Sequence, residues 1–132
     1  MEINLLALST YNVEQIQKNK EFFNMLISRI KSTYRVFNYS ESEHQNAKSI
    51  SFAPTDSRIS NVFIHMDING EVKFTFNVSR GVDRLEELKN KYAVDKWTYH
   101  TSLTIKKVNS ENYQEHLPYI VKGIEYCEYS FR

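Results

Sequence analysis

His100 and Ser102 are the residues whose types and spacing most clearly allow catalysis, because they stand two positions apart within residues 97–107. Apolar and polar side chains alternate along this segment, which predicts a strand. Residues two apart on a strand share one face of the sheet. A histidine beside a hydroxyl can combine acid–base catalysis with the binding of a phosphate group. The pair therefore defines a candidate catalytic site.

The tetrapeptide His100-Thr101-Ser102-Leu103 resembles one half of the signature of two-histidine phosphoesterases. That family has a second copy, and the best candidate for it here is His65-Met66-Asp67. An acidic residue stands there in place of Ser or Thr, and a carboxylate would repel phosphate. A small phosphoesterase that uses His100, Ser102 and His65 is an alternative function, and it requires both histidines to line one cleft.

A second set of charged residues surrounds a predicted turn. Asp67 with Glu71-Val72-Lys73 resembles the acidic residue and the Glu-x-Lys of restriction-type nucleases. Such a site holds its metal between two acids on one face of a sheet. The register that we expect for the hairpin directs Asp67 and Glu71 to opposite faces, which argues against a nuclease.

Motifs of other metal and cofactor sites are missing from the sequence. The histidines His44, His65, His100 and His116 are scattered, and Cys127 has no second cysteine to pair with. A zinc site needs clustered His and Cys ligands, and a phosphate-binding loop needs grouped glycines. Cys127 lies on the apolar stripe of the last predicted helix, where a small core residue is expected. We therefore expect no metal and no cofactor.

Basic residues form two groups that could contact nucleic acid. Lys18, Arg29 and Lys31 lie along the first predicted helix, and Lys106 and Lys107 end a predicted strand. Such side chains neutralise phosphates, and nearby aromatic rings can stack on bases. The net charge is +1, however, whereas a dedicated nucleic-acid binder usually carries a larger basic excess. Nucleic-acid binding is therefore a second alternative.

The clearest local signal is the turn Asn69-Gly70, which separates two β-rich segments. This dipeptide favours a two-residue type I′ turn, because both central residues need positive φ. In that register Ile68 pairs with Glu71, and the large aromatic residues face the core. The opposite face then carries four apolar residues of one strand, Val62, Ile64, Met66 and Ile68. We expect this apolar row to bind a protein partner or a second copy of the chain.

The spacing of apolar residues predicts helices over residues 12–33, 83–92 and 110–126, with Asn12 capping the first and Pro118 kinking or restarting the last. Strands are predicted over residues 2–8, 34–39, 49–53 and 97–107, and in the two arms of the hairpin. Polar residues 40–45 and 54–60 are expected to be loops. The order predicts an α+β fold: a mostly antiparallel sheet of four to six strands, with an N-terminal helix, a short middle helix and a C-terminal helix packed on one face.

The chain of 132 residues has the size of one domain, which we assign to residues 1–132. Its composition is 41% hydrophobic and 14% aromatic, which is enough for a packed core. It has one cysteine, no basic start before its first apolar run, and no apolar stretch of membrane-spanning length. We therefore expect a cytoplasmic protein that does not enter a membrane.

A series of predicted elements follows one order within residues 22–127: a helix (22–30), the strand Ser49-Ile50-Ser51-Phe52-Ala53, the hairpin arm 72–78, a strand that begins at Trp97, and a closing helix (112–126). This order resembles a small uncharacterised domain that is appended to predicted restriction-type nucleases and other prokaryotic defence-linked proteins. The family's polar loop after the hairpin is shortened here to Ser79-Arg80-Gly81. The family has no agreed catalytic residues, so the resemblance implies an accessory or recognition module.

We therefore predict a non-enzymatic accessory or interaction module of a prokaryotic or phage protein system, linked to nucleic-acid processing or defence. The expected partner is a protein or a second copy of the chain, and nucleic acid is the alternative partner.

Overall fold

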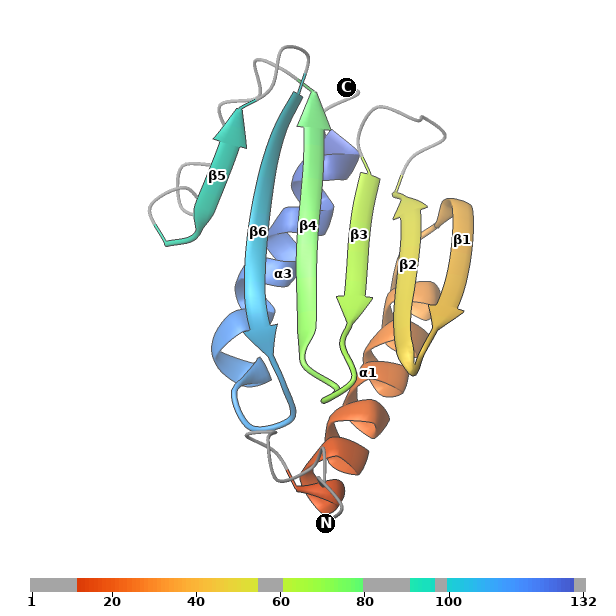
Figure 1. Cartoon of the computed structure of the whole chain (residues 1–132). Coiled ribbons are helices and arrows are strands. Elements are labelled where there is room, and N and C mark those ends of the chain that lie inside the picture. Colours follow the sequence, from red (N-terminus) through yellow and green to blue (C-terminus); the bar gives the residue numbers. More distant parts are fainter. Residues whose placement is uncertain (1–11, 55–60, 80–90, 97–99, 130–132) are drawn as a thin grey trace.

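The protein folds as a six-stranded antiparallel sheet with α1 and α3 on the same face (Figure 1). The computed structural model describes residues 12–54, 61–79, 91–96 and 100–129. The helices are α1 (Val13–Thr33) and α3 (Tyr113–Tyr129); the strands are β1 (Phe37–His44), β2 (Ala47–Ala53), β3 (Asn61–Met66), β4 (Val72–Ser79), β5 (Ala93–Lys96) and β6 (His100–Val108). The strand order is β1-β2-β3-β4-β6-β5. The predicted α+β class, with its first and last helices on one face, is confirmed.

The core lies between the sheet and the two helices. The inner strands contribute these fully buried side chains: Ile50, Phe52, Val62, Ile64, Phe74, Phe76, Leu103 and Ile105. Phe23 of α1 and Ile120 and Ile124 of α3 pack against them. Burial of apolar surface stabilises a fold by about 25 cal/mol per Å². The apolar stripes predicted on both helices are therefore the surfaces that hold them to the sheet.

Asn12 begins α1, as the sequence predicts. Its side chain accepts a hydrogen bond from the backbone N–H of Gln15 at 2.8 Å, which satisfies one of the free amides of the first turn. The Gln15 side chain does not complete a capping box. It donates instead to Asn19 Oδ1 and Ser110 Oγ, at 3.1 and 2.9 Å. Gln15 therefore links α1 to the segment that precedes α3.

The β3–β4 hairpin has a longer loop than the Asn69-Gly70 pair predicts. The Asp67 amide donates to the carbonyl of Glu71 at 2.9 Å, so three residues form the loop. Gly70 has a positive φ of 78°, as is usual for the residue that closes a three-residue hairpin loop. Because the register differs by one residue from the prediction, every side chain of β3 points to the opposite face.

The Asp67 carboxylate explains the longer loop. Its Oδ1 accepts hydrogen bonds from the backbone N–H groups of Asn69 and Glu71, at 2.9 and 3.0 Å. A short acidic side chain that bonds the amides ahead of it favours a turn of its own. This interaction competes with the type I′ preference of Asn-Gly, and it prevails here.

β1 and β2 form a second hairpin, which overlaps the strands predicted over residues 34–39 and 49–53 but has a tighter turn than predicted. Residues 40–45 are polar and were predicted to form a loop, yet β1 continues to His44. Gln45 and Asn46 have φ values of 50° and 69°, so they make the tight turn into β2. β1 is polar because it lies at an edge of the sheet, where charged side chains discourage pairing with other chains.

The short middle helix predicted over residues 83–92 lies mostly outside the described residues, as does the strand predicted over residues 2–8. Lys91 and Tyr92 lie in a turn, and β5 begins directly after them. β5 pairs with β6 and occupies the second edge of the sheet. This strand was not predicted from the sequence.

α3 continues through Pro118 without a break, so the predicted fresh start at this proline is wrong. Pro118 lies in the second turn of α3 and is exposed, so its missing N–H removes one hydrogen bond at the surface of the helix. Within the part of the chain that the structure describes, neither helix is long and apolar enough to cross a membrane.

Asn19 joins three segments of the fold and is completely buried. Its Nδ2 donates to the carbonyl of Asn69 in the hairpin loop at 3.0 Å. Its Oδ1 accepts from the N–H and the hydroxyl of Ser110, at 3.1 and 2.8 Å. Buried amides bonded in this way specify one arrangement of the elements that they join. The loop end of the sheet is therefore held to α1 at a defined position.

Candidate functional site

The two histidines of the predicted phosphoesterase site lie near opposite ends of the sheet. His65 pairs with Lys73 of β4, and His100 pairs with Ser79 of the same strand. Positions 73 and 79 are separated by about 20 Å at the usual rise of a strand. An acid and a base must both reach one scissile group. The register therefore argues against one cleft lined by His65 and His100.

Ser102 of the predicted catalytic pair is buried, and Cys127 is a core residue as predicted. Ser102 pairs with Asn77 of β4, and its side chain is 7% exposed. The Cys127 thiol is completely buried, and burial raises its pKa well above the usual range, so the nucleophilic thiolate is disfavoured. Among the described residues, no group of three or more His, Cys, Asp or Glu side chains could hold a metal ion.

Tyr92 and His116 form a hydrogen-bonded pair between the turn before β5 and α3. The Tyr92 hydroxyl and His116 Nδ1 are 2.9 Å apart. Burial, followed by the nearby Tyr119 and Glu115, raises the pKa of Tyr92 to about 12. A phenol with such a pKa stays protonated at neutral pH, and the tautomer of His116 decides which of the two groups donates the hydrogen bond. The pair therefore fastens the segment before β5 to α3.

The face of the sheet that points away from α1 and α3, called the open face below, is not covered by any described helix (Figure 1). Side chains alternate along strands, so this face carries the neighbours of the buried residues. Its described members on the inner strands include Ser49, Ser51, Phe63, His65, Lys73, Thr75, Asn77, Ser102, Thr104 and Lys106. The set is rich in hydroxyl groups, and none of these ten side chains is acidic.

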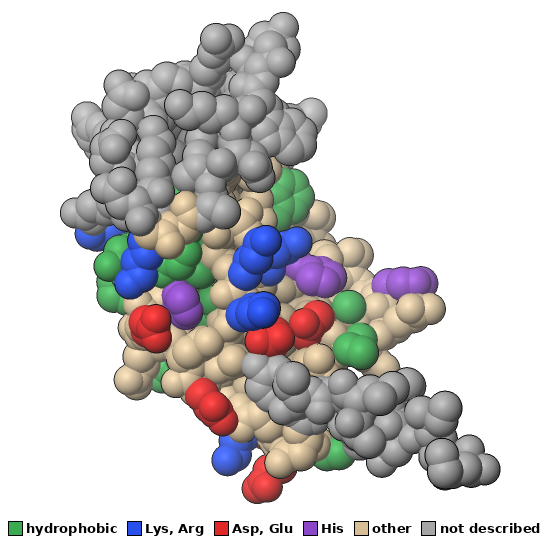
Figure 2. Space-filling model, turned by 60° about the vertical axis from the view of Figure 1, so that its left-hand side comes forward, with side chains coloured by type: hydrophobic (Ala, Val, Ile, Leu, Met, Phe, Trp, Pro, Cys, Tyr) green, Lys and Arg blue, Asp and Glu red, His purple; other side chains and the backbone are tan. Residues whose placement is uncertain are grey.

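A row of four polar residues crosses the open face from β2 to β6. Ser49 pairs with His65, and His65 pairs with Lys73. The Ser49 hydroxyl and His65 Nδ1 share a hydrogen bond of 3.0 Å. Lys106, on the next strand, ends the row. Figure 2 shows Lys or Arg side chains beside a His side chain in the middle of the described surface.

A bulge in β6 presents two lysines opposite Lys73. Val72 pairs with Val108, whereas Phe74 pairs with Ile105, so Lys106 and Lys107 together face one residue of β4. Lys107 has a φ of 57°, an uncommon conformation for a non-glycine residue. The Asn112 side chain donates to the carbonyl of Lys107 at 2.8 Å and holds the bulge. Bulges of this kind re-aim side chains and are frequent beside functional sites.

Phe63 is the large apolar residue of the open face, and its side chain is 41% exposed. It pairs with Ser51 on one side and with Thr75 on the other. It thus lies between two hydroxyl groups. It is two residues along β3 from His65, which belongs to the row that contains Lys73. An exposed aromatic ring on a flat sheet can stack on a planar group of a ligand.

Acidic side chains lie at one border of the open face and behind it. Asp67 and Glu71 lie opposite each other at the hairpin end, so the expectation that they point to different faces is wrong. Asp67 Oδ1 is occupied by backbone amides of the loop. Figure 2 shows Asp or Glu side chains below the central Lys or Arg side chains. The hairpin end is therefore one acidic border of the open face, and Asp95 of the edge strand β5, which pairs with Ser102, occupies a second acidic position at that face.

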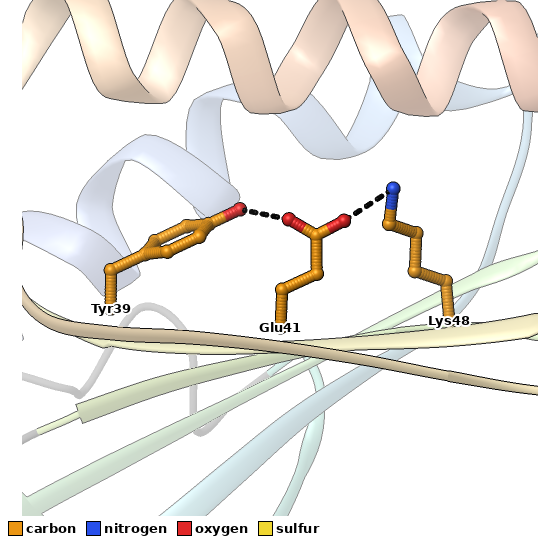
Figure 3. A network of polar contacts seen from close by, with 3 residues as sticks. All are labelled: Tyr39, Glu41 and Lys48. Carbon is orange, nitrogen blue, oxygen red and sulfur yellow. Dashed lines mark hydrogen bonds and ion pairs between the residues drawn. The ribbon is translucent and has the colours of Figure 1, made fainter.

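The acids of the edge strand β1 point to the helix side. Glu41 accepts a hydrogen bond from the Tyr39 hydroxyl at 3.0 Å and forms an ion pair with Lys48 (Figure 3). The ammonium group of Lys48 lowers the pKa of Glu41, and the Tyr39 hydroxyl lowers it further. Lys31 of α1 lies 4.1 Å above the Tyr39 ring. This network connects α1 to the sheet edge and keeps its carboxylate away from the open face.

The apolar row predicted as an interaction surface belongs to the core instead. Val62 and Ile64 are completely buried, and Met66 is 6% exposed. The three-residue hairpin loop turns these side chains toward the helices, which is why the two-residue register predicted the wrong face. Ile68 is 59% exposed, but it lies at the tip of the loop rather than in a row. The exposed apolar residue that the prediction missed on β3 is Phe63.

The structure separates the predicted nucleic-acid contacts into two groups. Lys18, Arg29 and Lys31 are exposed on α1, behind the sheet. Lys106 and Lys107 are exposed at the bulge of β6, next to the open face. The strand register, which the sequence does not reveal, adds Lys73 and His65 to the second group.

An apolar groove of about 170 Å³ lies between α1 and α3. Its lining includes Leu26, Ile30 and Ile120, with Arg29 as its charged member. The lining of this groove is mainly apolar and contains no pair of groups suited to acid–base catalysis. The open face therefore remains the candidate site.

The fold and the site define a two-layer α+β protein, with both described helices on one side of the sheet and a largely polar face, which no described helix covers, on the other. No family model, curated protein or solved structure matches the chain. The function must therefore be inferred from the open face itself.

Proposed function

We propose that the chain is a non-enzymatic accessory or interaction module that binds a macromolecular partner through the open face of its sheet. The observation that carries this proposal is the exposure of Phe63 at the centre of that face, with no described helix over it. Antiparallel sheets commonly have one solvated face, which is then polar throughout. An exposed aromatic ring among hydroxyl groups is typical of a binding surface.

The chemistry of the site supports binding rather than catalysis. The open face of the described strands is a sheet surface, whereas enzymes usually act in a concave pocket. His65 shares a hydrogen bond with Ser49, but His100 lies about 20 Å away along the strands. The resemblance to domains appended to predicted nucleases agrees with an accessory role in a prokaryotic or phage system, linked to nucleic-acid processing or defence.

The proposal is tested by comparing two variants of the tagged chain in a lysate of its host. The first variant combines Phe63→Ala with Lys73→Glu on the open face. The second combines Met25→Ala with Lys18→Glu on α1, where Met25 is 43% exposed, much as Phe63 is. Captured protein is identified by mass spectrometry, captured nucleic acid by nuclease digestion, and self-association by light scattering.

We expect the wild type and the α1 variant to retain the same partner, and the open-face variant to lose it. If self-association is the function, the mass measured by light scattering falls to that of one chain in the open-face variant alone. Loss of the partner from the α1 variant alone, or from neither variant, would overturn the proposal, because the binding surface would then lie elsewhere.

A further inference from the structure

We propose that the partner of the open face is single-stranded RNA, with its phosphates near Lys73, Lys106 and Lys107 and a base stacked on Phe63. This inference rests on the proposed function, since it uses the same face. It assigns chemical roles to residues that face the same solvent region from β3, β4 and β6.

The charges of the face favour an anionic ligand. Lys73 stands opposite Lys106 and Lys107 at the bulge, and all three side chains are exposed. Like charges that face one another across strands are unfavourable without a ligand, and a phosphate between them removes the repulsion. Among the described residues, the acids next to this group are Asp67 and Glu71 at the hairpin end, where Asp67 is already bonded to the loop. Asp95 of β5 lies farther along the face, where it pairs with Ser102.

The position of Phe63 favours a ligand that also has planar groups. Its ring is 41% exposed, and Phe63 lies two residues along β3 from His65, which pairs with Lys73. Bases of a single strand are free to stack on aromatic side chains, whereas the bases of a duplex are already stacked. Lysine side chains beside an exposed ring therefore fit a single-stranded nucleic acid that lies across the sheet better than they fit a duplex.

The hydroxyl groups beside the ring favour RNA over DNA. Ser51 and Thr75 are the direct neighbours of Phe63 on the two adjacent strands, which are about 4.8 Å away. A base stacked on Phe63 would bring its ribose close to one of them. The 2′-hydroxyl can both donate and accept a hydrogen bond, and it is the group by which proteins distinguish RNA from DNA.

The test measures fluorescence anisotropy of a labelled oligouridylate, the matching oligodeoxythymidylate and an RNA duplex with the full-length chain. We expect the oligouridylate to bind most tightly. Phe63→Ala should weaken its binding about 5- to 150-fold, the range found for loss of one stacked base, while Phe63→Tyr should retain binding. Lys73→Ala and Lys106→Ala should each reduce the slope of log K against log salt by about 0.7.

The matched controls are Met25→Ala and Lys18→Ala on α1, and neither should change affinity or salt slope. Equal binding of the oligodeoxythymidylate would overturn the choice of RNA, and preferred binding of the duplex would overturn the single-stranded mode. If no oligonucleotide binds, while the open-face variant still loses a protein partner from the host lysate, this inference fails and the proposed function stands. If α1 variants alone weaken RNA binding, both fail.

Discussion

Gly70 and Asn19 touch so closely that a Cβ atom on Gly70 would lie 2.5 Å from the Cβ of Asn19. The contact joins the β3–β4 loop to the first half of α1, where Asn19 also bonds the carbonyl of Asn69. A Cβ is fixed to the backbone, so relief would require a shift of the helix or of the loop. The contact therefore holds the β3–β4 loop directly against α1.

Replacement of Gly70 by alanine should therefore destabilise the protein. The positive φ of 78° alone costs an alanine about 1–2 kcal/mol, and the contact with Asn19 adds to that cost. Urea unfolding followed by circular dichroism measures the change. Gly70→Asn is the informative control, because asparagine tolerates positive φ but also carries a Cβ. If Gly70→Asn is as stable as the wild type, the contact is not tight.

Asn19→Ala should reduce the free energy of unfolding by about 2–4 kcal/mol, because it removes the bonds to Asn69 and Ser110 from a buried site. Alanine has the higher helix propensity, so the loss cannot come from the helix itself. Asn24→Ala, at an exposed position of the same helix, controls for propensity and should be neutral or slightly stabilising. Equal effects of the two substitutions would contradict the joining role of Asn19.

The hairpin register predicts opposite tolerances at two adjacent positions of β3. Ile64→Ser should cost at least about 3 kcal/mol, because Ile64 is completely buried and the hydroxyl would lack a partner. Phe63→Ser should cost about 1 kcal/mol or less, because the ring is partly exposed. Thermal unfolding of both variants measures the difference. A two-residue turn would exchange the two results, so the reverse order would refute the register.

Much of the fold could be predicted from local patterns. The helix cap at Asn12, the apolar stripes of both helices and the burial of Cys127 depend on neighbours within a few turns, and the structure contains each of them. The hairpin failed because two local signals compete at the same turn. Asn69-Gly70 favours a loop of two residues, and the Asp67 carboxylate favours a loop of three. The face to which every β3 side chain points therefore depends on a small difference in free energy between these two loops.

The edges of the sheet and the candidate site could not be predicted for a different reason. Residues 40–44 of β1 are polar on both faces, so this part of the strand lacks the alternation that identifies a strand. The basic group at the bulge depends on the pairing of β4 with β6, which are separated in the chain by residues 80–99. Lys106 and Lys107 could be predicted from their charge, but the β4–β6 pairing places Lys73 beside them, and the β3–β4 pairing places Phe63 on the same surface.

Tyr92 should ionise about two pH units later than an ordinary tyrosine. Burial raises its pKa from 10.0 to about 12, with Tyr119 and Glu115 contributing. The unfolded chain releases this proton first as the pH rises, so the contribution of Tyr92 to stability is complete below pH 10 and declines as the pH approaches 12. The difference between wild-type and Tyr92→Phe absorbance at 295 nm isolates this phenol. A step near pH 10 would show that Tyr92 is not held against α3.

Gly123 of α3 lies directly on the ring of Phe76, and a Cβ at this position would meet three ring atoms at 2.6–2.7 Å. Two effects of Gly123→Ala therefore oppose each other. The helix propensity of alanine is more favourable than that of glycine by about 0.8–1.0 kcal/mol. Overpacking of a filled core, in contrast, destabilises the protein by about 1–3 kcal/mol. Phe76 is completely buried and stacks beside Phe74 with ring centroids 6.3 Å apart, so it has little room to move. We expect the overpacking to prevail and the free energy of unfolding to fall by about 1–2 kcal/mol.

The cause is established by a double-mutant cycle with Phe76→Leu, measured by urea unfolding. The smaller side chain leaves space for the new methyl group, so Gly123→Ala should be much less harmful in that background than in the wild type. The two substitutions would then be coupled through the contact between α3 and β4. A stabilising Gly123→Ala in the wild type would mean that helix propensity outweighs packing here, and that α3 does not lie as close to Phe76 as the structure shows.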